Sequence, residues 1–152
     1  MRLSWHSTEN LTLVGALACG ATASANLAQV GTYFWANALY FFLPQLAALG
    51  AARLCGCANR SSLAGFAVGL AVYLIGVSHL PVQEAKASVT IFLVYLLGLP
   101  GGIAALLATS TRVQERIGNH VVQVVITTAA LSLLGMTASS GALFALIVLG
   151  TD

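Results

Sequence analysis

The charged side chains of this chain gather in a few short segments and leave long uncharged stretches between them. Six of them are basic and four are acidic. They stand at Arg2, Glu9, Arg53, Arg60, Glu84, Lys86, Arg112, Glu115, Arg116 and Asp152. The intervening stretches supply segments near the roughly 20 residues with which a helix crosses about 30 Å of hydrocarbon. The spacing of charge therefore predicts an all-α polytopic membrane protein.

The composition argues against a water-facing globule. Charged residues make up 7% of the chain and hydrophobic residues 59%, with a mean hydropathy of +0.92. A soluble domain carries about 25% charged residues, which cover its surface. Because five crossings with short loops use nearly all of the 152 residues, we expect one transmembrane helical domain over residues 1–152. The chain has no basic patch of the kind that binds nucleic acid, so membrane lipid is the expected surrounding partner.

Five apolar segments are predicted to form a bundle of membrane helices. Their approximate bounds are 11–30, 33–54, 63–80, 88–110 and 120–150. The last segment is longer than one perpendicular crossing requires, so it either tilts or breaks near 139–141. The first segment could instead be a signal peptide cleaved after Ala23-Ser24-Ala25, although Glu9 weakens the basic start that such a peptide needs.

The basic residues predict the orientation of the bundle. A cytoplasmic N-terminus leaves Lys86 alone on the outer side. The cytoplasmic side then holds Arg2, Arg53, Arg60, Arg112 and Arg116. This distribution satisfies the positive-inside rule. We therefore expect a cytoplasmic N-terminus and residence in a bacterial inner membrane.

Small residues recur along one side of two predicted helices. They are Gly65, Gly69 and Gly76 in the third segment, and Ser132 and Gly135 in the last. Van der Waals packing is the main attraction between helices in lipid, and small residues let two backbones approach closely. We expect these positions to pack helices within the monomer, or to bind a partner helix.

A polar stripe follows one side of the first predicted helix in alternating steps of three and four residues. Its members are Thr12, Gly15, Cys19, Thr22, Asn26 and Gln29. A polar side chain that faces hydrocarbon has no partner, so this side is expected to face protein or water. Because the stripe holds no ionisable group, we interpret it as a seam between helices. The alternative is the lining of a polar pathway.

Two prolines lie inside predicted helices. Pro44 lies near the middle of the second segment, and Pro100 stands among Gly98, Gly101 and Gly102 in the fourth. A proline removes a backbone donor and crowds the carbonyl four residues earlier, so both helices should kink. The three glycines around Pro100 predict a full interruption there. Broken helices often mark a transport site, whereas a purely structural kink is the alternative.

The chain contains no motif for catalysis, nucleotide binding or a cofactor. Cys55 and Cys57 are separated by one residue, which is not the customary metal-binding spacing, so no metal is expected. No acid–base pair lies within an apolar segment, and we do not expect an enzyme. We expect the protein to bind another membrane or membrane-active protein, as an accessory subunit or an immunity-type protective protein. The alternative is a small transporter or channel that uses the segment around Pro100.

Overall fold

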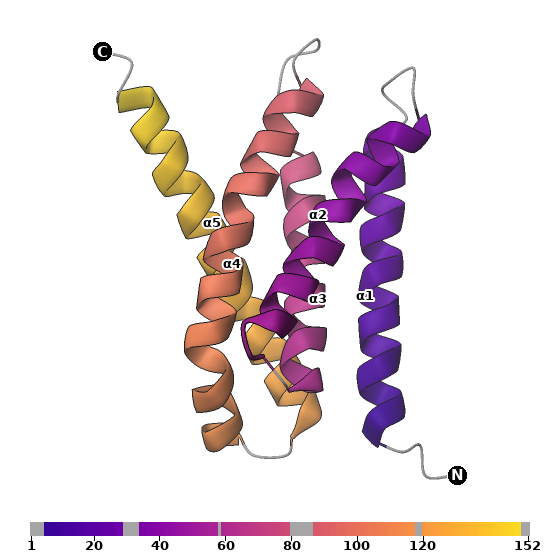
Figure 1. The fold of residues 1–152 in the computed structure, drawn as a ribbon, viewed down its shortest axis with the longest axis vertical. Helices are drawn as coiled ribbons and strands as arrows, with labels where there is room; N and C mark the ends of the chain where they lie inside the picture. The colour runs from indigo at the N-terminus through magenta and orange to yellow at the C-terminus, as the bar shows by residue number, and fades with distance from the viewer. Residues whose placement is uncertain (1–4, 29–33, 58, 80–86, 118–119, 150–152) are drawn as a thin grey trace.

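Five α-helices make up nearly all of the chain that the structure describes. The computed structural model describes residues 5–28, 34–57, 59–79, 87–117 and 120–149. The helices are α1 (Trp5–Ala28), α2 (Phe34–Leu54), α3 (Arg60–Ser78), α4 (Ala87–Ile117) and α5 (Val121–Leu149). Consecutive helices run in opposite directions, so that α1 begins and α5 ends at opposite ends of the bundle (Figure 1). The predicted all-α helical bundle is therefore confirmed for the described residues.

Helix α3 is the centre of the packing. It contacts each of the other four helices, and most of its side chains are buried. Phe66, Leu70 and Leu74 of α3 form the core with Tyr95 of α4 and Met136 of α5. α5 packs against α3 and α4, and α1 and α2 pack against α3 and against each other. α2 also contacts α4 through the rings of Tyr40, Phe41 and Phe92, so α4 lies against both α5 and α2.

The connection between α2 and α3 is built from two local signals. Gly56 has a φ of +102°, and Cys57 N donates to Ala52 O over 3.1 Å. This hydrogen bond and a second one, from Gly56 N to Arg53 O, end α2 in a Schellman motif, which favours glycine at the left-handed position. Asn59 then caps α3 by accepting a hydrogen bond from Ser61 N over 3.0 Å.

The expected interruption at residues 98–102 is absent from the described helices, and so is the break at 139–141 that was the alternative to a tilted last helix. α4 continues without a break through residues 98–102, and α5 continues through residues 139–141. A membrane helix tolerates proline and glycine where neighbouring helices and small local adjustments satisfy the freed backbone groups. Instead of breaking, α5 crosses α4 and leans away from the bundle at its C-terminal end (Figure 1).

Three helical stretches are long and apolar enough to cross a membrane. They are Arg60–Ser78, Ile91–Ile117 and Val121–Ala142. A shorter apolar stretch, Ala38–Leu54, covers most of α2. By length and composition these three stretches support a membrane protein, whereas the described residues of α1 and α2, two of the five predicted membrane helices, do not provide a stretch of this kind.

Candidate functional site

A close contact between α4 and α5 is formed at two glycines. A Cβ atom placed on Gly101 would overlap the carbonyl oxygen of Gly135, and a Cβ atom on Gly135 would overlap that of Gly101. Ser139 Oγ of α5 also donates to Leu97 O of α4 over 2.7 Å. Any side chain at either glycine would push the two backbones apart. This contact brings together the predicted residues Gly101 and Gly135.

The other glycines beside Pro100 are also packed. A Cβ atom on Gly98 would meet the ring of Tyr73, whose hydroxyl donates to Val94 O over 2.9 Å. A Cβ atom on Gly102 would lie 2.6 Å from Met136 Cγ. The helix is therefore continuous at the position where a break was expected, and its glycines pack closely against the neighbouring helices.

The glycines of α3 face α5. A Cβ atom on Gly65 would lie 2.5 Å from Val125 O, and one on Gly69 would lie 3.1 Å from Ala129 O. Ser132 is fully buried beside Gly69. Gly76 differs, because it is exposed and has no atom within 4 Å of its Cβ position. The predicted set therefore divides into four residues at helix contacts and one at the surface.

Three residues of the polar stripe of α1, Cys19, Thr22 and Asn26, border a cavity between α1 and α3 and are not packed into a helix contact. Gly15, Cys19, Thr22 and Asn26 are exposed, Thr12 is half-buried, and Gln29 lies outside the described residues. The physical reason is local: Thr22 Oγ1 hydrogen bonds to Ala18 O and Cys19 O of its own helix, over 3.0 and 2.9 Å. A hydroxyl satisfied in this way does not need an interhelical partner.

The buried face of α1 is organised by Gln45 of α2. The Gln45 amide nitrogen lies 3.3 Å from Ser24 Oγ, 3.4 Å from Phe41 O and 3.5 Å from Gly20 O. Gly20 has no side chain, and its Cβ position is filled by the Gln45 amide group. The role of Gln45 was not predicted from the sequence, although an isolated amide in an apolar segment is a signal for an interhelical hydrogen bond.

A cavity of about 550 Å³ with a partly polar lining lies between α1 and α3. Its polar lining comes from Cys19, Thr22, Asn26, Ser78 and His79. His79 Nδ1 lies 2.7 Å from Ile75 O, and since a carbonyl only accepts, this nitrogen carries the proton. The cavity does not include the Pro100 segment. The two halves of the predicted polar pathway are thus on different sides of the bundle.

A second cavity, an open and almost wholly apolar groove of about 620 Å³, separates α2 from α4. We call it the α2–α4 groove. Its lining residues are Tyr40, Leu43, Pro44, Ala47, Ala48, Ala51, Phe92, Leu96, Leu99, Pro100 and Ile103. Toward one end the rings of Tyr40 and Phe92 meet with centroids 4.3 Å apart. The groove brings together Pro44 and Pro100, which lie 56 positions apart in the sequence.

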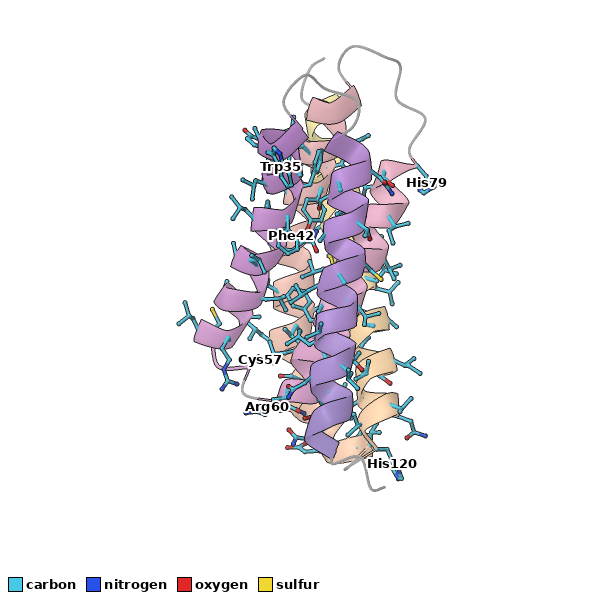
Figure 2. The ribbon with its side chains drawn as sticks, turned by 90° about the vertical axis from the view of Figure 1, so that its right-hand side faces the viewer. Trp35, Phe42, Cys57, Arg60, His79 and His120 are labelled. Atoms are coloured by element: carbon cyan, nitrogen blue, oxygen red, sulfur yellow. The ribbon has the colours of Figure 1, made fainter. Side chains whose placement is uncertain are left out.

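The described arginines lie at one end of the bundle. They are Arg53, Arg60, Arg112 and Arg116, all at the end where α2 and α4 finish and α3 and α5 begin. Arg60, Cys57 and His120 mark this end in Figure 2, and Trp35 and His79 mark the other. Ser61 Oγ donates to Glu9 Oε1 there, which joins the first turns of α1 to α3. Burial raises the pKa of the Cys57 thiol, and the nearby Arg53 partly opposes this shift.

Comparisons with known proteins give no relative for this chain. No family model, curated protein or solved structure matches it. The function therefore has to be inferred from the surfaces of the bundle, and the α2–α4 groove is the most open and most apolar of those described above.

Proposed function

We propose that this chain is an inner-membrane protein that binds a transmembrane helix of a partner protein in the α2–α4 groove. The partner binding takes one of the two forms expected from the sequence, an accessory subunit or an immunity-type protective protein. The N-terminus lies in the cytoplasm in this proposal, because the arginine-bearing end then meets the positive-inside rule.

The observation that carries the proposal is the size pattern of the groove. Small side chains, those of Ala47, Ala48 and Ala51, line its α2 side, and two of them are spaced by four residues. Larger side chains, including Leu43 and Leu96, border them. A row of small residues on a helix lets a second helix backbone approach closely, which is the usual basis of helix association in lipid. The pattern favours a helix as the occupant.

The transporter alternative has less support. A pathway for a polar solute needs polar or ionisable groups at membrane depth. The α2–α4 groove is apolar. The space next to the glycines beside Pro100 is filled by Tyr73, Met136 and Gly135. The stripe of α1 borders a separate cavity, which shares no lining residue with the groove.

The test is to fill the groove and measure the complex. Ala47 is exposed and lines the groove, so Ala47→Trp should occupy the space of the partner helix while leaving the monomer core intact. Ala130→Trp is the matched control, because Ala130 is exposed on α5, away from the groove. We expect affinity purification from native membranes in mild detergent to recover a stoichiometric membrane partner with the wild type and with Ala130→Trp, but not with Ala47→Trp. Recovery of the same partner with Ala47→Trp would mean that the interface lies elsewhere.

A further inference from the structure

A smaller cleft lies at the arginine-bearing end, between the last turns of α4 and the first part of α5. Its volume is about 300 Å³. Its lining is almost wholly apolar and includes Val113 and Ile117 of α4 and Leu131 of α5, together with the stems of Arg112 and Arg116. This cleft does not share a residue with the α2–α4 groove.

The two arginines are available for a ligand. Both are exposed, and they lie four residues apart, so that their side chains project from the same side of α4. Neither makes an ion pair or hydrogen bond with another described residue. Glu115 is exposed nearby but does not line the cleft. The exposed guanidinium groups therefore lie beside an apolar cleft rather than inside it.

The length of α4 places these arginines near the membrane surface. α4 has 31 residues, which correspond to a helix of about 46 Å. The hydrocarbon layer is about 30 Å thick, so the ends of α4 reach the headgroup region. Arg112 and Arg116 belong to the last two turns of α4. Arginine side chains at such a position extend to the interface, while their stems cover apolar surface.

From this geometry we propose that the cleft binds an anionic phospholipid. The headgroup phosphate is held by the guanidinium groups of Arg112 and Arg116, which present planar sets of donors that match phosphate oxygens. The first part of an acyl chain lies on Val113, Ile117 and Leu131. Basic pockets between membrane helices on the cytoplasmic side are suited to such lipids. The inference depends on membrane residence and not on the partner proposed above.

The experiment measures thermal stabilisation of the purified full chain in nonionic detergent by added lipid. A ligand that binds only the folded state raises the melting temperature. We expect phosphatidylglycerol to raise it by about 5 °C, and zwitterionic phosphatidylcholine to raise it by much less. The double variant Arg112→Gln/Arg116→Gln should lose the difference between the two lipids. Native mass spectrometry of the same samples should show one retained phosphatidylglycerol on the wild type and none on the double variant.

Three controls test whether the lipid effect comes from this cleft. Arg60→Gln removes an exposed arginine at the same end but outside the cleft, and it should keep the full lipid effect. Thr127→Phe fills the cleft without changing its charge and should weaken the effect. Glycerol phosphate carries the charged group without acyl chains and should not stabilise the protein. An equal loss in Arg60→Gln, an unchanged effect in the double variant, or full stabilisation by glycerol phosphate would each overturn the proposal.

Discussion

The two faces of α4 differ in how they meet their neighbours. One face presents Gly98, Gly101 and Gly102 and lies against α3 and α5, so closely that an added methyl group would overlap neighbouring atoms. The opposite face presents Leu96, Pro100 and Ile103 and borders the open α2–α4 groove. Both faces are apolar. Hydrophobicity alone therefore does not decide which face of this helix is closed.

The difference lies in side-chain size. Lipid tails are as apolar as leucine, so helices in a membrane associate through van der Waals fit and a few hydrogen bonds. At the α4–α5 contact, glycine faces glycine and the backbones touch. Across the groove, large side chains such as Leu43 and Phe92 stand on both helices, the rings of Tyr40 and Phe92 meet, and Ala47 stays exposed. The two helices thus come into close contact where small residues face one another, and large side chains on both helices leave the groove open.

The strongest test of this comparison adds a single methyl group to the glycine face of α4. Gly101→Ala places a Cβ atom onto the Gly135 carbonyl, and we expect it to lower the free energy of unfolding by roughly 2 kcal/mol. Gly141→Ala is the matched control, because Gly141 is exposed on α5 with no atom within 4 Å of its Cβ position. Alanine favours a helix over glycine, so the control should be neutral or slightly stabilising. Denaturant titration in detergent micelles checks both, and equal destabilisation would contradict the role of side-chain size.

A smaller effect is expected where the overlap is less severe. Gly65→Ala would bring a Cβ atom to 2.5 Å from Val125 O and 2.9 Å from Thr128 Cβ, at the contact of α3 with α5. We expect a loss of about 1 kcal/mol in the same denaturant titration, because the nearest backbone atom would lie at 2.5 Å, farther away than the one at Gly101. Gly76→Ala, on the same helix, adds its methyl group to open space and should leave the unfolding free energy nearly unchanged. If the two variants change the unfolding free energy equally, then the lack of a side chain at Gly65 is not needed for the contact between α3 and α5.

The helices themselves could be predicted from the sequence, because their cause is local. Long uncharged runs separated by charged segments indicate helices of membrane length, and the structure has five helices in these runs. The helix ends were less predictable. α4 extends to Ile117 rather than stopping near residue 110, since the polar segment after it contains the good helix formers Arg112, Gln114 and Glu115.

The surfaces could be predicted only in part, because they depend on which helices meet. The prediction of a break at residues 98–102 was wrong, since propensity describes an isolated helix and not one held by Tyr73 and Met136. The residues of the α1 stripe share one side of the helix, but their periodicity does not say whether that side packs against a neighbour or borders a cavity. The orientation of α1 depends on Gln45, which belongs to another helix. The α2–α4 groove joins two distant prolines, and no local pattern in the sequence connects them.

The smallest expected effect is a difference in thiol reactivity between two neighbouring cysteines, one buried and one exposed. Cys57 is 2% exposed, whereas Cys55 is exposed. Burial raises the pKa of the Cys57 thiol, and only the thiolate reacts with a maleimide. At pH 8 we therefore expect Cys57 to react at least about tenfold more slowly than Cys55, and its rate should continue to rise at higher pH. The measurement uses single-cysteine variants that lack Cys19 and one of the pair, in membranes.

The same shift predicts the direction of a pH effect on stability. Because the pKa of Cys57 is higher in the folded state than in the unfolded chain, its thiol contributes stability at low pH. That contribution is lost as the pH rises through the unfolded-state value and then the folded-state value. Cys57→Ser should therefore flatten the alkaline fall in melting temperature, whereas Cys55→Ser should leave it unchanged. Equal labelling rates and equal alkaline curves would show that the turn after α2 opens readily, and the packed end of the bundle would then finish one turn earlier, near Ala52.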